Sequence, residues 1–148
     1  VSGGAFASET FAARMDTLRT FTSGSDNTVI FEEELWDSDS AYNTGTGKFI
    51  VPTAGYYLFG GTIKFHETAS QFISCTIYMN VAGVQEQVCQ WYDLNGQSSQ
   101  VTLTYSVPSD SLSVSDEVYM QAAAGTYDSS SYNCPAGWNA SFWGVRIA

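Results

Sequence analysis

Alternating hydrophobic and polar positions recur along the chain and predict short β-strands. The clearest case is the segment 71–80, in which Ile73, Cys75, Ile77 and Met79 occupy every second position. A period of two places these four side chains on one face of a strand and the residues between them on the other. The pattern is typical of a strand that covers a core with one face.

Eight further segments have strand character, and turn signals rich in Gly, Pro, Ser, Asn or Asp separate them. They comprise residues 9–21, 27–36, 48–51, 55–65, 84–92, 98–107, 116–123 and 139–147. The polar segment 125–138 predicts a long loop. Strands at this spacing leave no room for crossover helices, so we predict an all-β antiparallel sandwich or barrel of about nine or ten strands.

The segment 9–21 admits two interpretations. Phe11, Met15 and Leu18 fit one face of a helix, whereas Phe11, Ala13 and Met15 fit one face of a strand. We favour the strand because everything that follows is predicted to be β.

Composition limits both the fold and the partners. The 148 residues have a mass of 16.1 kDa, and the 44% that are hydrophobic suffice for the core of one domain. The 15 acidic and 5 basic residues give a net charge of −10, which disfavours binding to nucleic acids and anionic membranes. No apolar run is long enough for a transmembrane helix. We expect residues 1–10 to be an N-terminal tether and 11–148 to be one head domain of a longer, processed protein, because the chain begins with Val.

Three motifs follow one another in a fixed order. They are Tyr42-Asn43-x-x-Thr46-Gly47-x-Phe49-x-x-Pro52-x-x-Gly55-x-Tyr57-x-Phe59, then Leu112-x-x-Ser115-Asp116-x-Val118, and finally Phe142-Trp143-Gly144-Val145-Arg146-Ile147. Together they resemble the signature of the complement C1q globular-head family, which shares its jelly roll with tumour necrosis factor. The resemblance covers nearly the whole chain, from residue 11 to the C-terminus.

The sequence also departs from the animal members of that family. Ser115 stands where they have Gly, and Asp37 and Asp39 stand where they tend to have Asn-x-Gly. The stretches 11–14 (Phe-Ala-Ala-Arg) and 36–39 (Trp-Asp-Ser-Asp) look more like bacterial and phage versions of the domain.

The resemblance implies a ten-stranded jelly-roll sandwich that assembles as a homotrimer and is not an enzyme. We expect an extracellular recognition and assembly domain, at the end of a phage fibre or a bacterial surface filament. The alternatives are a secreted C1q-domain lectin that recognises molecular patterns, and a purely structural trimerisation knob. The expected partners are further copies of the chain and a glycan or protein receptor on a cell surface. The expected location is a virion or a cell surface.

Aromatic residues are unusually frequent, with 4 Trp, 9 Tyr and 9 Phe, so we expect a surplus at subunit interfaces or exposed loops. Phe49 and Tyr57 flank a turn at Pro52, which predicts two strands in register with both rings facing inward. Tyr57, Phe59 and Phe142 are expected in the core or on a trimer axis. Both faces of the strand 55–65 are apolar, which predicts that one meets the core and the other a neighbouring subunit.

Two groups of aromatic residues are the candidate binding residues. One is Trp91-Tyr92-Asp93, and the other consists of Tyr127, Tyr132 and Trp138 in the predicted loop. Rings among Ser, Asn and Asp suit stacking on sugars or docking of a protein, and loops often carry recognition on a rigid β scaffold. The alternative is that these rings fold back over the ends of the sandwich.

The acidic run from Glu32 to Asp39 is the one candidate for a metal. Its carboxylates are the kind of ligand that calcium prefers, which makes Asp37 and Asp39 weak calcium candidates. A solvated acidic edge that discourages aggregation is the simpler interpretation. No other cofactor is expected.

Catalysis is not indicated by any motif. His66 is the sole histidine and no nucleophile motif accompanies it, so we expect a solvated loop residue. With 15 acidic residues, the sequence still allows the pair of carboxylates that a glycoside hydrolase needs. The resemblance disfavours this alternative. The sequon Asn139-Ala140-Ser141 opens a predicted core strand and is not expected to be glycosylated.

Three cysteines without metal-ligand spacing allow at most one disulfide. A three-residue hairpin loop at 81–83 would make Cys75 and Cys89 direct cross-strand neighbours, which permits either a disulfide or two reduced, buried thiols. Cys134 is expected to be unpaired in its loop.

Overall fold

The computed structural model describes residues 9–22, 27–65, 73–93, 101–124, 131–134 and 137–148, and all of its regular elements are β-strands. In chain order they are β1 (Thr10–Met15), β2 (Arg19–Thr22), β3 (Asn27–Thr28), β4 (Glu33–Asp37), β5 (Tyr42–Asn43), β6 (Lys48–Ile50), β7 (Tyr57–Phe65), β8 (Ile73–Val81), β9 (Val84–Asp93), β10 (Val101–Pro108), β11 (Glu117–Ala124), β12 (Ser131–Cys134) and β13 (Gly137–Arg146). In this part of the chain, no helix is present that could cross a membrane.

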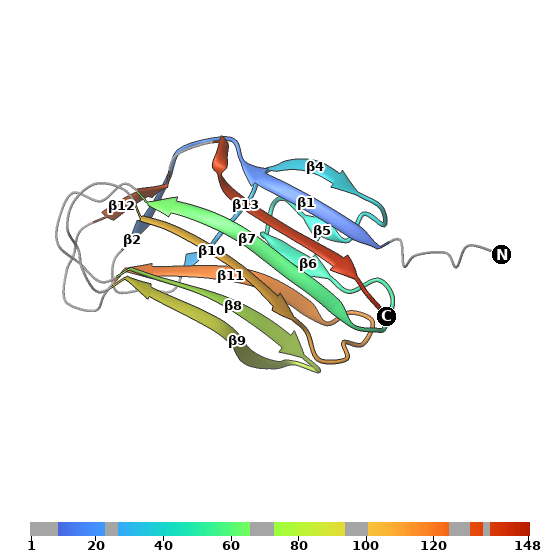
Figure 1. Cartoon of the computed structure of the whole chain (residues 1–148). Coiled ribbons are helices and arrows are strands. Elements are labelled where there is room, and N and C mark those ends of the chain that lie inside the picture. Colours follow the sequence, from blue (N-terminus) through green and yellow to red (C-terminus); the bar gives the residue numbers. More distant parts are fainter. Residues whose placement is uncertain (1–8, 23–26, 66–72, 94–100, 125–130, 135–136) are drawn as a thin grey trace.

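Two antiparallel sheets face each other (Figure 1). The five-stranded sheet has the order β10-β7-β13-β1-β4, and the six-stranded sheet has the order β5-β6-β11-β8-β9, with β3 beside β11. β12 and β2 form a separate pair. The predicted antiparallel sandwich is therefore confirmed. The strands outnumber the prediction because segments 9–21 and 27–36 each divide into two strands, and because β5 and β12 lie in segments predicted to be turns or loops.

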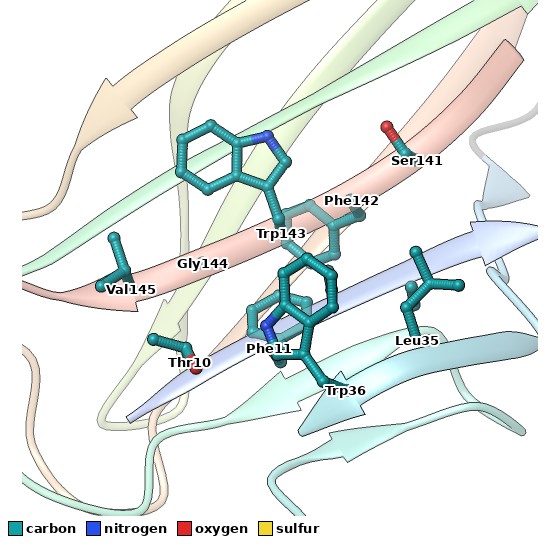
Figure 2. A pocket seen from close by; sticks show the side chains of 11 residues that line it. Thr10, Phe11, Leu35, Trp36, Ser141, Phe142, Trp143, Gly144 and Val145 are labelled. Atoms are coloured by element: carbon teal, nitrogen blue, oxygen red, sulfur yellow. The ribbon is translucent and has the colours of Figure 1, made fainter. Parts of the chain in front are cut away.

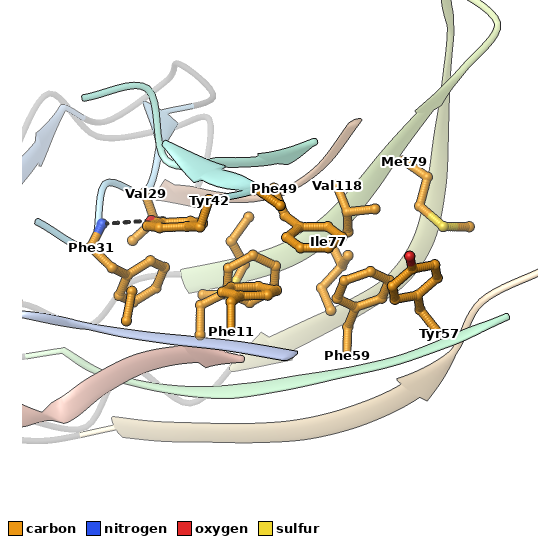
Figure 3. Packing of buried hydrophobic residues seen from close by; sticks show 14 of the residues in the cluster. Phe11, Val29, Phe31, Tyr42, Phe49, Tyr57, Phe59, Ile77, Met79 and Val118 are labelled. Atoms are coloured by element: carbon orange, nitrogen blue, oxygen red, sulfur yellow. Dashed lines mark hydrogen bonds between the residues drawn. The ribbon is translucent and has the colours of Figure 1, made fainter. Parts of the chain in front are cut away.

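Aromatic rings from both sheets fill the space between them (Figure 3). The Phe11 ring of β1 stacks on Phe49 of β6 with centroids 4.6 Å apart, and it contacts Phe142 of β13 edge-on at 5.0 Å. Phe11, Ala13 and Met15 are all buried, which confirms the strand interpretation of this segment. Tyr57, Phe59 and Phe142 are at most 1% exposed, so the structure places all three in the core.

A glycine is required where β13 passes between two of these rings. A Cβ atom on Gly144 would lie 2.6 Å from Cε1 of Phe11 and 2.7 Å from Cδ1 of Phe59. Carbon atoms in contact are normally about 3.5–4.0 Å apart, so no side chain fits at this position without moving a ring.

The turn at Pro52 differs from the prediction. Phe49 and Tyr57 do face inward, with ring centroids 5.7 Å apart, but β6 and β7 belong to opposite sheets and do not pair. The connecting backbone hydrogen-bonds to a distant segment instead: Gly55 N–H donates to the Leu112 carbonyl at 2.9 Å, and Leu112 N–H donates back at 2.8 Å. The proline segment therefore carries the chain from one sheet to the other.

The hairpin of β8 and β9 also corrects a prediction. Val81 pairs with Val84, so the turn contains only Ala82 and Gly83, with φ of 50° and 83°. Positive φ at both central residues is typical of a type I′ turn, whose twist matches that of the strands. The prediction of a three-residue loop at 81–83 was therefore wrong.

The register of this hairpin shifts again between Ile77 and Tyr78. Cys75 is consequently opposite Trp91, and Cys89 is opposite Ile77. The prediction that the two cysteines are direct neighbours was wrong, because both the shorter turn and the bulge change which residues pair.

The predicted polar loop at 125–138 contains β12, whose residues Ser131 to Cys134 pair with Thr22 to Arg19 of β2. Cys134 is thus on a paired strand and opposite Arg19, not in a loop. The alternation of apolar residues gave no sign of this strand, since its sequence is largely polar.

Candidate interaction surface

The outward face of the five-stranded sheet has an apolar hollow of about 380 Å³. Trp36 of β4 and Trp143 of β13 project from its floor, with Leu35 and Val145 beside them (Figure 2). Trp36 is 56% exposed and Trp143 is partly exposed. We call the surface formed by Leu35, Trp36, Trp143 and Val145 the tryptophan face.

Small residues next to the indole rings create the hollow. Ala12 of β1 pairs with Trp143 on one side and with Trp36 on the other. Gly60 of β7 is the partner of Trp143 on the next strand. Cross-strand neighbours normally cover each other's side chains, but an alanine and a glycine leave the indole rings uncovered.

A bulge in β4 adds to this surface. The register between β1 and β4 shifts between Ala12 and Ala13, which pair with Trp36 and Glu34, so Leu35 is an extra residue in β4. Leu35 lines the hollow beside Trp36 as a result. Sequence reasoning anticipated surplus aromatic residues at an interface, but it did not single out Trp36 or Trp143.

An ion pair lies on β1 and β4 near the tryptophan face. Arg14 Nη2 donates to Glu33 Oε1 at 2.8 Å, and the two residues are direct cross-strand partners. This hydrogen bond lowers the pKa of the Glu33 carboxyl below its usual value, against a smaller opposing effect of desolvation. Both charges are compensated within the chain, so the hollow itself remains apolar.

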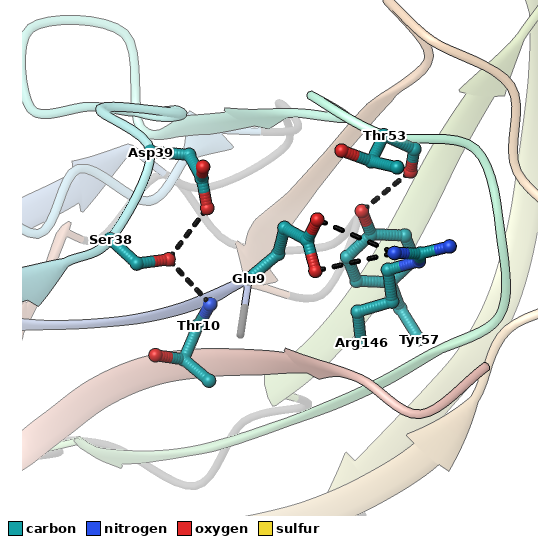
Figure 4. A network of polar contacts seen from close by, with 7 residues as sticks. All are labelled: Glu9, Thr10, Ser38, Asp39, Thr53, Tyr57 and Arg146. Carbon is teal, nitrogen blue, oxygen red and sulfur yellow. Dashed lines mark hydrogen bonds and ion pairs between the residues drawn. The ribbon is translucent and has the colours of Figure 1, made fainter. Parts of the chain in front are cut away.

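A polar network joins the beginning of β1 to the end of β13 (Figure 4). Glu9 forms an ion pair with Arg146 at 3.4 Å, while Thr10 N–H donates to Ser38 Oγ at 3.0 Å. The phenol of Tyr57 donates to the Thr53 carbonyl at 2.7 Å. The pKa of Glu9 is lowered, mainly by backbone hydrogen bonding. Desolvation opposes this shift, while the hydrogen bonds with Thr53 and Arg146 and the charge of Arg146 add to it.

Carboxylates of the acidic run accept hydrogen bonds from other groups of the protein. Glu32 accepts the N–H of Thr17 at 2.7 Å. Asp37 accepts the N–H of Tyr42 at 2.6 Å, and Asp39 accepts the Ser38 hydroxyl at 2.6 Å. Among the described residues, no three His, Cys, Asp or Glu side chains gather as a metal site would need. Calcium binding at Asp37 and Asp39 stays a prediction.

The candidate binding aromatics are distributed over three strands. Trp91, Tyr92 and Asp93 end β9, Tyr132 is on β12, and Trp138 is near the start of β13. These strand ends lie at the end of the sandwich opposite the N-terminus (Figure 1). Tyr127 and His66 fall outside the described residues. A binding role for these aromatic residues stays a prediction.

Comparisons with known proteins agree with this architecture. The C1q domain family model matches residues 10–138. The globular domain of zebrafish complement 1qA is 18% identical, with a TM-score of 0.67 over 95% of this chain and 98% of that one. Eiger TNF from S. frugiperda is also 18% identical, with a TM-score of 0.70 over 95% and 92% of the two chains. Murine APRIL is 11% identical, with a TM-score of 0.70 over 94% and 98%.

No curated protein matches the sequence significantly. The solved structures share the fold, and the family model covers most of the chain, including the motifs at 42–59 and 112–118. The chain therefore belongs to the C1q domain family and has the jelly roll that this family shares with TNF-like proteins.

Proposed function

We propose that the chain is a non-catalytic head that assembles as a homotrimer through the tryptophan face. The observation that supports this most directly is the exposure of Trp36 and Trp143 around an apolar hollow. Large exposed apolar surfaces on soluble proteins usually mark interaction sites, and a buried tryptophan contributes strongly to an interface. Contact with a neighbouring copy would remove both rings from water.

The family favours a copy of the same chain as the partner. The resemblance to the C1q globular head implies three protomers closed around a threefold axis. In such a ring each protomer contacts the next through two different surfaces, so the tryptophan face of one copy is covered by another surface of its neighbour. Arg14 and Glu33 compensate each other next to this face, which spares the interface an unpaired charge.

The trimer would act as an extracellular recognition or assembly domain. We favour the end of a phage fibre or of a bacterial surface filament, because residues 11–14 and 36–39 resemble the bacterial and phage versions of the domain. Trp91, Tyr92, Asp93, Tyr132 and Trp138 would then contact a receptor at the end remote from the N-terminal tether.

The mass of the protein in solution tests the proposal. Light scattering at micromolar concentration should give three times the chain mass of 16.1 kDa. Replacing both Trp36 and Trp143 by Ala should convert the trimer to a monomer that remains folded, because neither ring belongs to the core. The control is Val84→Ala, which truncates an equally exposed residue on the β8–β9 hairpin and should leave the trimer intact. A wild-type protein of 16.1 kDa would overturn the proposal.

A further inference from the structure

One basic side chain on the outward face of the five-stranded sheet has no acidic partner among the described residues. Four of the five basic residues of the chain form ion pairs: Arg14 with Glu33, Arg19 with Glu32, Lys48 with Glu117 and Arg146 with Glu9. The fifth is Lys64 of β7, which follows the fully buried Ile63. Lys64 therefore shares the outward face with Trp143, whose partner Gly60 is four positions earlier on β7.

A neighbouring protomer that covers this face has to compensate the Lys64 ammonium group. Lys64 is partly exposed in the single chain, so water solvates its charge there. Taking an unpaired charge out of water is costly, whereas a carboxylate from the partner offsets this cost. Each copy of the chain has 15 acidic residues against 5 basic ones, so a second copy is well suited to supply that carboxylate.

Asp16 is an exposed carboxylate at nearly the same level along the strands. β1 and β7 are both antiparallel to β13, so they run in the same direction. Ser141 of β13 pairs with Arg14 of β1 on one side and with Thr62 of β7 on the other. Asp16 and Lys64 are each two positions beyond this row. They lie on opposite sides of β13, about 10 Å apart if two strand spacings separate them.

The Asp16 carboxylate forms no hydrogen bond or ion pair with the described residues. Its charge does act on Arg14, whose pKa is raised mainly by the hydrogen bond with Glu33 and least by Asp16. The other exposed carboxylates in the described ranges belong to segments nearer the N-terminal end of the sandwich (Figure 1), and they are Glu34, Asp39, Glu86 and Asp110. Asp16 is therefore the carboxylate best placed to meet Lys64.

We propose that Lys64 forms an ion pair with Asp16 of the neighbouring protomer, so that three such pairs surround the threefold axis of the trimer. The inference rests on the proposed homotrimer, whose axis runs from the tether to the opposite end of the head. Because the two residues flank β13, an axis in front of β13 turns Lys64 of each protomer toward Asp16 of the next. The same axis passes beside Trp143 and Val145 of β13, which belong to the tryptophan face.

Charge reversal tests the pair in the assembled protein. Light scattering establishes the trimer, and native mass spectrometry of mixed isotope-labelled and unlabelled trimers then measures how fast they exchange subunits. Lys64→Glu and Asp16→Lys should each accelerate exchange by roughly tenfold or more, or leave only monomers, because each variant brings three pairs of like charges together. The circular dichroism spectrum of each variant should match that of wild type, since neither side chain belongs to the core.

The double variant Lys64→Glu, Asp16→Lys exchanges the two charges and should return the exchange rate to within about threefold of wild type. The matched control is Lys64→Glu with Glu34→Lys, which has the same net charge but should exchange as fast as Lys64→Glu alone. The ion pair is refuted if the single variants exchange like wild type, if the double variant is no slower than they are, or if the control recovers equally. A wild-type monomer would overturn the homotrimer as well, whereas a wild-type trimer with any of these results refutes the ion pair alone.

Discussion

Adding one methyl group at Gly144 should destabilise the protein by about 3 kcal/mol, the upper part of the range for overpacking a core. The new Cβ atom would lie about 1 Å inside the normal contact distance of both Phe11 and Phe59. Neither ring has room to retreat, because Phe11 is stacked on Phe49 at 4.6 Å and Phe59 is packed against Tyr57 at 5.8 Å. The clash therefore exceeds the gain of up to about 1 kcal/mol that alanine normally brings to a strand in place of glycine.

Thermal and denaturant unfolding of Gly144→Ala measure this cost. For a domain of this length, about 3 kcal/mol corresponds to a melting temperature lower by roughly 6–12 °C. Gly45→Ala is the matched control, since its Cβ atom would meet only Asn43 Oδ1, at 3.2 Å. Adding Phe59→Leu to Gly144→Ala should recover part of the loss, because the two sites are in contact. A Gly144→Ala protein as stable as wild type would refute the account of how β13 packs on the rings.

Two further predictions concern the core and the ion pair beside the tryptophan face. Phe142→Ala should lower the free energy of unfolding by roughly 3–5 kcal/mol, because the ring is fully buried, and a denaturation midpoint like that of wild type would contradict this. Arg14 lowers the pKa of Glu33 below its ordinary 4.5, so this carboxylate stabilises the fold above that pH, and the contribution is lost as the pH falls through the lowered pKa. Glu33→Gln should therefore flatten the decline of melting temperature below pH 4.5, and parallel curves for variant and wild type would show that the pair contributes nothing.

Hydrophobic alternation predicted the strands that face the core. Phe11, Ala13 and Met15 follow a period of two, and the structure buries all three. Alternation was not sufficient on the strand 55–65, because both of its faces are apolar, and only the structure places Tyr57 and Phe59 in the core and not on a trimer axis.

Pairings that depend on distant residues could not be predicted in this way. The turn at Pro52 looks like a hairpin from its local sequence, but Gly55 pairs with Leu112, which is far along the chain. The strand Ser131–Cys134 carries no apolar alternation and exists because it pairs with β2. The register of the β8–β9 hairpin depends on a turn and a bulge, each of which moves it by one residue.

The tryptophan face shows the same limitation. Trp36 and Trp143 are far apart in the sequence, and only the position of β1 between β4 and β13 brings them to one surface. In the other sheet, Tyr78 of β8 likewise stacks on Tyr119 of β11, although the two strands are separated along the chain.

The position of β1 also determines how the domain responds to mechanical load. β1 has a hydrogen-bonded neighbour on each side, and it begins at the end of the sandwich where β13 stops. When the head is held at its opposite end, tension on Glu9 runs along β1 and shears both ladders together, so many hydrogen bonds must break at once. When tension instead separates Glu9 from Arg146, their ion pair breaks first, and the hydrogen bonds between β1 and β13 then break one after another. The same domain is therefore strong against pulling along β1 and weak against pulling Glu9 away from Arg146.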